Sequence, residues 1–186
     1  MRPEPDLTVL SQEAQDALIS WWKELDAGSA DRALLRHCRT PRDVACTPAF
    51  HRLILRLEPW CGPMSPGSVD RLSLVAGVLS HVKGNRPDAF EKDITRSFAV
   101  QMARPFPPWG RGENACVSDL RFRKLLKIEE PDTLYTTMIH LVRRLNGSVD
   151  IAGLAHGIVQ WNESTKKEWA YAYYEHVARE EKQGVR

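Results

Sequence analysis

The sequence lacks the features that place a protein in a membrane or direct it out of the cell. No stretch approaches the roughly 18 consecutive apolar residues that a membrane-spanning helix requires. Residues 1–6 contain two prolines and two acidic residues, and no apolar segment typical of a secretory signal follows them. We therefore expect a cytoplasmic protein that has no membrane partner.

Cysteine is scarce and irregularly spaced, and no two cysteines form a C-x-x-C pair. A zinc site is the alternative use of cysteine, and this spacing gives it no support. Because the cytoplasm is reducing, we expect free thiols or small core residues. The four cysteines are Cys38, Cys46, Cys61 and Cys116.

The short motifs that mark common catalytic and cofactor sites are also missing. The sequence contains no G-x-S-x-G, no H-E-x-x-H, no histidine pair at i and i+4, and no phosphate-binding glycine loop. We therefore expect no catalytic residue, no cofactor and no metal ligand; an enzyme whose site assembles from distant residues is the weakest hypothesis. The histidines, which we expect at the surface or at helix ends, are His37, His51, His81, His140, His156 and His176.

What the sequence does contain is a helical pattern. Of its 186 residues, 42% are hydrophobic and 27% are charged, as in folded domains. Ala14, Leu18 and Trp21 recur at intervals of four and three residues, which places them on one helix face. No segment alternates with the period of two that is typical of strands. We predict an all-α fold of about eight to nine helices, in one compact unit or two bundle-like lobes.

Residues that cap helices divide this pattern into segments. Two further helices are expected at about 30–38 and 89–103, and loops rich in proline and glycine at 58–68 and 104–114. The expected caps are Ser11 (helix ending at Gly28), Thr40, Thr47 (helix to Leu57), Ser68 (69–82), Ser118 (119–127), Asp132 or Thr133 (helix to Leu145), Asp150 (151–161) and Ser164 (165–181).

The long loop suggests a division of the chain, although a surface loop within one domain is equally compatible with it. The predicted parts are a flexible N-terminus (1–10), an N-terminal helical lobe (11–103), a Pro/Gly-rich connection (104–117), a C-terminal helical lobe (118–181) and a tail (182–186).

Charge is unevenly distributed along the chain, although the net charge is only +2. Residues 1–31 hold two basic and seven acidic residues, whereas residues 32–127 hold 17 basic and eight acidic residues. A basic section of this kind indicates a polyanionic partner, and an ordinary solvated surface is the alternative.

The basic residues share helix faces. Arg121 and Lys124 lie at i and i+3, Arg123 and Lys127 at i and i+4, with no acid between them. Arginine offers a planar set of donors that suits phosphate, and each neutralised phosphate releases counterions. Arg143 and Arg144 lie near a predicted helix C-terminus, where the helix dipole alone would favour cations. The nucleic-acid-binding residues that we predict are Arg36, Arg52, Arg56, Arg121, Arg123, Lys124, Lys127, Arg143 and Arg144.

Tryptophan is the other residue that could contact nucleic acid. Trp60 and Trp109 are expected in loops beside the basic region, where they could stack on unpaired bases or simply pack. The face shared by Trp169 and Tyr173 is expected to be core, with a possible interface at its rim. The tryptophans expected in the core or at subunit contacts are Trp21, Trp22, Trp161 and Trp169.

Several segments in order resemble one known family. Residues 22–29 resemble its W-x-x-L-x-x-G signature, 47–53 its P-A-F-Y-R-L segment and 117–126 its R-F-x-x-L-L helix. The ending Trp161…Trp169…Tyr173-Tyr174 is similar as well. The family is CasB, the small subunit of the type I-E CRISPR Cascade complex, and the resemblance covers roughly 18–175. The chain departs from it at His51, where the family has Tyr, and in the 104–114 loop.

The resemblance implies a helical, non-catalytic subunit that sits as a pair along an RNA-guided complex. It implies contacts with other Cascade subunits and the crRNA-containing complex, and help in holding target and displaced DNA strands in the R-loop. Base pairing then reads the sequence, while the protein contributes charge and shape. We expect sequence-independent binding of nucleic acid backbone; the alternative is an assembly subunit whose basic faces contact acidic proteins.

Overall fold

The computed structural model describes residues 11–27, 29–87, 93–104 and 115–184, and within them the chain is almost entirely helical. The all-α prediction is therefore confirmed, with ten helices in these ranges. The helices are α1 (Gln12–Ala27), α2 (Ser29–His37), α3 (Pro41–Ala45), α4 (Pro48–Cys61), α5 (Pro66–Leu79), α6 (Ile94–Ala103), α7 (Asp119–Leu126), α8 (Pro131–Arg144), α9 (Ile151–Val159) and α10 (Glu163–Gly184).

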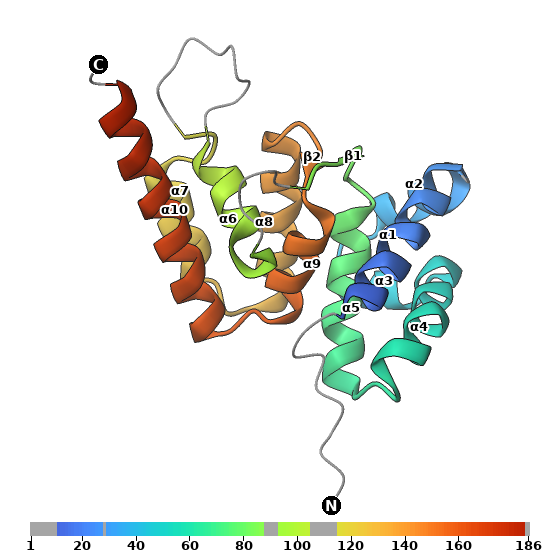
Figure 1. The fold of residues 1–186 in the computed structure, drawn as a ribbon. Helices are drawn as coiled ribbons and strands as arrows, with labels where there is room; N and C mark the ends of the chain where they lie inside the picture. Colours follow the sequence, from blue (N-terminus) through green and yellow to red (C-terminus); the bar gives the residue numbers. More distant parts are fainter. Residues whose placement is uncertain (1–10, 28, 88–92, 105–114, 185–186) are drawn as a thin grey trace, which may run out of the picture.

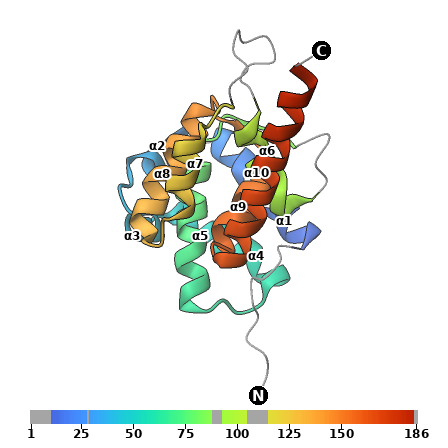
Figure 2. The same cartoon turned by 90° about the vertical axis from the view of Figure 1, so that its left-hand side faces the viewer.

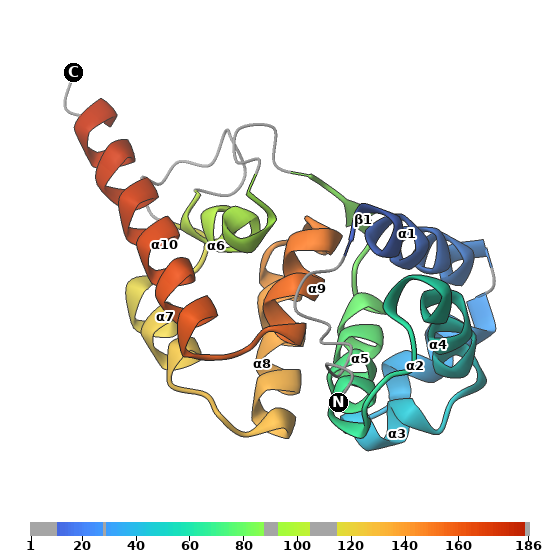
Figure 3. The same ribbon diagram turned by 60° about the horizontal axis from the view of Figure 1, so that its bottom comes forward.

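The helices form two groups that meet along α5 (Figure 1). Helices α1–α5 pack together, and we term them the N-terminal lobe; helices α6–α10 form the C-terminal lobe. Helix α6 packs on α9 and α10, so it belongs with the second group although it precedes the 104–117 connection. Figure 2 shows the C-terminal lobe facing the viewer, and Figure 3 shows α5, α8 and α9 between the outer helices of the two lobes.

Local capping explains where several helices begin. Thr40 and Asp43 form a capping box at the start of α3, Thr47 accepts from the Phe50 N–H at 3.3 Å, and Asp150 caps α9. The Ser11 hydroxyl accepts from the Ala14 N–H at 3.3 Å. These hydrogen bonds confirm four predicted caps. Sequence can predict such caps because each depends only on residues within one helical turn.

Two predicted boundaries between α4 and α5 are wrong. Helix α4 continues through Cys61, with Pro59 inside its last turn, and ends where Gly62 has φ 66°. Proline is tolerated there because the N–H it lacks would bond only the carbonyl of Leu55, a residue that is 67% exposed. Helix α5 begins at Pro66 and is capped by Ser65 rather than Ser68.

Three later helices differ from expectation, α7 in its capping bond alone and α8 and α10 in where they begin. Ser118 occupies the N-cap of α7, but its side chain makes no capping hydrogen bond. Helix α8 begins at Pro131, after Glu130 and not after Asp132 or Thr133, because proline is favoured at the first helical position. At α10 the Asn162 carboxamide, rather than Ser164, accepts from the Thr165 N–H at 3.0 Å.

A short parallel pair of strands, which the sequence analysis did not predict, joins the two lobes. Strands β1 (Gly84–Asn85) and β2 (Ser148–Val149) follow α5 and α8, and each has only two residues. The Lys83 N–H donates to the Gly147 carbonyl at 2.8 Å, and Gly147 has φ 75°. Two residues cannot show a period of two, so no pattern in the sequence marks these strands.

The core runs through both lobes as one hydrophobic cluster. Four tryptophans expected there, Trp21, Trp22, Trp161 and Trp169, are at most 6% exposed. Trp169 packs so closely on α9 that a Cβ at Gly157 would overlap its ring. Tyr173 is 2% exposed, which confirms the predicted core face of the last helix.

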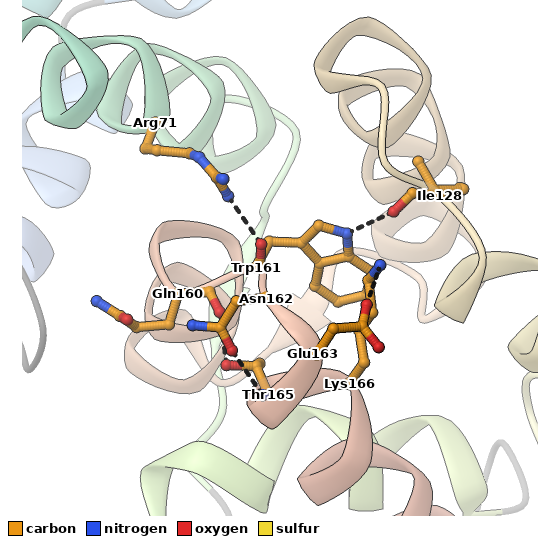
Figure 4. A network of polar contacts seen from close by, with 8 residues as sticks. All are labelled: Arg71, Ile128, Gln160, Trp161, Asn162, Glu163, Thr165 and Lys166. Carbon is orange, nitrogen blue, oxygen red and sulfur yellow. Dashed lines mark hydrogen bonds and ion pairs between the residues drawn. The ribbon is translucent and has the colours of Figure 1, made fainter.

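A polar network at the start of α10 ties the lobes together (Figure 4). Arg71 on α5 donates to the carbonyls of Ile158 and Trp161, each at 3.3 Å, at the end of α9. The Trp161 indole N–H donates to the Ile128 carbonyl at 2.9 Å, and the ammonium of Lys166 lies 5.7 Å from its ring centroid. The arginine thus adds a side-chain donor to the carbonyls that end α9, where backbone hydrogen bonding of the helix stops.

Candidate nucleic-acid interface

The basic residues divide into those with a carboxylate partner and those without one. On α4, Arg56 forms two hydrogen bonds with Glu24 of α1, at 2.7 and 2.9 Å, and Arg52 pairs with Asp31 of α2. These two arginines therefore hold α4 against α1 and α2. Much of their positive charge is compensated, which the spacing of Arg52 and Arg56 in the sequence did not reveal.

Helix α7 presents cations on its outer face because its apolar residues point inward. Phe122 and Leu125 are fully buried, and Phe122 stacks on Tyr173 at a centroid distance of 4.0 Å. Arg121, Lys124 and Lys127 are exposed, and none of them forms an ion pair with any residue in the described ranges. The outward cation face predicted for this helix is therefore present.

One member of the α7 face has a local partner. The Arg123 Nε lies 3.1 Å from Asp119 Oδ2, and the Tyr174 hydroxyl donates to Asp119 Oδ1 at 2.6 Å. Burial and this hydrogen bond raise the pKa of Tyr174 to about 12. The single carboxylate thus anchors α10 to α7 and offsets part of the charge of Arg123.

The adjacent arginines at the end of α8 have different surroundings. Arg144 contacts the segment before α7: its Nε donates to the Cys116 carbonyl at 2.5 Å, and the Cys116 thiol lies 3.5 Å from the Arg144 carbonyl oxygen. Burial raises the pKa of that thiol. Both arginines are exposed, but Arg144 fastens the segment before α7 to α8, whereas Arg143 points toward the N-terminal lobe.

Arg143 meets residues of the N-terminal lobe at the junction. Its Nη2 lies 3.4 Å from His81 Nδ1, just beyond the end of α5. Arg36, at the end of α2, donates from Nε to the Ser80 carbonyl at 2.8 Å. Desolvation of the half-buried imidazole, with smaller contributions from Arg143 and Arg36, lowers the pKa of His81 to about 4.

The structure thus brings together Arg36, His81 and Arg143, which lie far apart in the sequence. Sequence reasoning missed His81, and it ranked Arg143 low because a helix C-terminus already attracts cations. It also missed Lys83, whose side-chain stem packs over Gly147 beside the end of α8. Nothing in the local pattern around these residues marks them, because their grouping depends on how α2, α5 and α8 pack.

The described ranges also hold the cysteines and one of the two tryptophans that were expected in loops. There, no three metal-ligating side chains gather, all four cysteines are free thiols, and no helix is long and apolar enough to cross a membrane. Trp60 is 53% exposed at the end of α4, whereas Trp109 lies outside the described residues. The expected ending of the first helix at Gly28 also falls on a residue outside the described ranges.

Comparisons with known proteins found a matching family model and a solved structure of similar fold. The family model of the CRISPR-associated protein Cse2 matches residues 31–174. A chain in the crystal structure of E. coli Cascade bound to a PAM-containing dsDNA target has the same fold, with a TM-score of 0.60 and 17% sequence identity. The similarity covers 88% of this chain and 95% of that chain. No curated protein matches the sequence.

Proposed function

Since the chain belongs to the CRISPR-associated Cse2 family, we propose that it is a non-catalytic subunit of an RNA-guided Cascade complex and helps to hold target DNA. The resemblance to CasB is confirmed, because both names denote this small subunit. The E. coli complex that contains the similar chain is bound to double-stranded DNA. We infer that this chain has the same kinds of partner in the cytoplasm: other Cascade subunits, guide RNA and DNA. Self-association within the complex stays a prediction.

The observation that carries the proposal is the set of exposed cations without a carboxylate partner. Arg121 and Lys124 on α7, and Arg36 and Arg143 at the lobe junction, form no ion pair within the part of the chain that the structure describes. Such cations gain more from a phosphate than paired ones, because no existing ion pair has to break. Contacts of this type carry no sequence information, which suits a complex in which the guide RNA reads the sequence.

The predicted site residues therefore separate into two groups. We retain Arg36, Arg121, Lys124, Lys127 and Arg143 as phosphate contacts, and Arg123 as a weaker one that shares its charge with Asp119. Those assigned to structure are Arg52, Arg56 and Arg144.

The test removes charge from α7 in the assembled complex. Replacing Arg121→Gln and Lys124→Gln together removes two phosphate contacts, so the slope of log affinity for DNA against log salt should fall by about 2. The matched control is Arg52→Gln with Arg56→Gln, which also removes two charges, but charges already paired with Asp31 and Glu24. The control should leave the slope unchanged. Equal slopes in the α7 variant, the control and the wild type would contradict the proposal.

A second candidate function is assembly through a protein interface, and one surface favours it. Leu120 on α7 and Tyr171 on α10 are 58% and 69% exposed, and Tyr174, whose hydroxyl bonds Asp119 at the start of α7, is 41% exposed. Aromatic side chains of this kind are enriched at protein interfaces. If this function dominates, Leu120→Ser with Tyr171→Ser should release the chain from the complex in size-exclusion chromatography, and the α7 charge variant should do so before it weakens DNA binding.

A further inference from the structure

Three helices of the two lobes end close together at the junction. Helices α2 and α5 belong to the N-terminal lobe and α8 to the C-terminal lobe, and β1 and β2 pair beside the ends of α5 and α8 (Figure 1). The Arg36 guanidinium is tethered to Ser80 through Nε alone, at 2.8 Å. The Arg143 guanidinium approaches the neighbouring residue, His81, through Nη2 at 3.4 Å. Each arginine therefore keeps two guanidinium nitrogens available.

Positive charge at this junction has no internal compensation. In the described ranges neither Arg36 nor Arg143 has an ion-pair partner, and the charges that act on the His81 imidazole are those of Arg36 from α2 and Arg143 from α8. The imidazole is neutral at neutral pH, since burial and both arginines lower its pKa to about 4. Its Nδ1 can therefore accept a hydrogen bond from Arg143. Two cations gathered around a neutral ring repel each other, and a bound anion would offset that repulsion.

We propose that Arg36 and Arg143 clamp one phosphate group of bound nucleic acid, and that His81 positions Arg143 within this clamp. The inference rests on the proposed function and gives it a specific contact. Two guanidiniums can donate to the non-bridging oxygens of one phosphate, in the fork geometry that makes arginine suited to phosphate. Because the arginines come from different lobes, the same phosphate would join α2 to α8.

The salt dependence of DNA binding distinguishes a shared phosphate from two separate ones. The assembled complex is prepared with wild-type chain, Arg36→Gln, Arg143→Gln and the double variant, and binding of a DNA target is measured across about 50 to 200 mM salt. A shared phosphate predicts that the double variant lowers the slope by about 1 in total. Each single variant should weaken binding, and the second substitution should add less than the first.

Two results would overturn the clamp. Wild-type affinity and slope in the double variant would show that no phosphate binds there, and a slope lowered by about 2 would show two separate phosphates. The paired Arg52→Gln and Arg56→Gln double variant controls for lost charge on the same lobe. The α7 variant tests the proposed function independently, because Arg121 and Lys124 are not part of the clamp. If only the clamp variants match the wild type, the clamp fails and the proposed function stands.

The positioning role of His81 is tested by keeping or removing its acceptor. Asn at this position places an amide oxygen near the site of Nδ1, so His81→Asn should retain the wild-type affinity, whereas His81→Leu should weaken DNA binding several-fold. In the Arg143→Gln background the leucine substitution should have no further effect, because the group that it positions is gone. An equal loss in both backgrounds would show that His81 acts through general stability, and would overturn its assigned role.

A measurement on the isolated full chain covers variants that do not assemble. Inorganic phosphate is titrated while the imidazole resonances of His81 are followed by NMR. We expect a saturable shift in the wild-type chain that is absent from the Arg36→Gln/Arg143→Gln variant. A shift of equal size in both proteins would overturn the clamp, because phosphate would then act on His81 without the arginines.

Discussion

The buried surroundings of His81 make the stability of the protein depend on pH. The pKa of His81 is lowered from 6.5 to about 4 in the folded chain, chiefly by desolvation and then by Arg143 and Arg36. In the unfolded chain the imidazole titrates near its ordinary value. Between these two values the unfolded state binds a proton that the folded state does not, so acid favours unfolding. The stabilisation is complete above about pH 6.5 and is lost as the pH falls toward about 4.

The size of this effect follows from the two pKa values. For a fully shielded imidazole, the free energy of unfolding would be about 2 kcal/mol lower at about pH 5 than at about pH 7.5. Because His81 is only half-buried and keeps part of its hydration, we expect about 1 kcal/mol. For a chain of 186 residues this corresponds to a fall of about 2 to 4 °C in melting temperature.

The assay compares the wild type with His81→Asn by urea unfolding at the two pH values. Asparagine keeps an acceptor for Arg143 but does not titrate, so the variant should lose about 1 kcal/mol less than the wild type on acidification. His156, whose pKa burial also lowers, is present in both proteins and cancels in the difference. Identical pH dependence in the two proteins would refute the neutral, shielded state of His81.

Three further predictions concern the packing of the core and the role of Arg144. Phe122→Ala should lower the free energy of unfolding by about 3 to 5 kcal/mol, because the ring is fully buried and stacked. The control, Leu120→Ala at an exposed position of the same helix, should change it by less than about 0.5 kcal/mol. Equal losses for the two variants in urea unfolding would contradict this prediction. Gly157→Ala should cost about 1 to 3 kcal/mol through overlap with Trp169, and an unchanged thermal midpoint would show that the ring can move aside. Arg144→Gln should lower the free energy of unfolding by about 1 to 3 kcal/mol, because the Cys116 carbonyl loses its donor. The slope of log DNA affinity against log salt should stay unchanged. A reduced slope would instead assign Arg144 to the nucleic-acid interface.

Local features of the chain were readable from the sequence because their causes are local. The helical periodicity, the caps at Thr40, Thr47 and Asp150, and the buried tryptophans all depend on residues within a few positions or on bulk apolarity. The same reasoning misplaces the end of α4, because a proline within a helical pattern predicts a helix end and Pro59 instead lies inside the last turn. At Pro59 the helix had only one turn left, and the missing N–H removed a single bond at the exposed side.

The outward cation face of α7 also followed from the sequence, because one amphipathic helix determines which side faces solvent. Which cations remain without a partner did not follow, since that depends on acids brought close by the fold. Arg52 and Arg56 meet Asp31 and Glu24 from 21 and 32 positions away. Arg143 reaches His81 across 62 positions and forms no ion pair with any carboxylate of the described residues.

The sequence by itself therefore determined the helical class, most of the helix starts, the buried face of each strongly amphipathic helix and the family resemblance. Only the tertiary structure decided that Arg36 and Arg143 share a junction between lobes, that Arg52 and Arg56 pair with carboxylates, and that Arg144 donates to a backbone carbonyl. The physical reason is range: hydrogen bonding and periodicity within a helix act over three or four residues, whereas charge compensation acts through space between helices that the chain order leaves far apart.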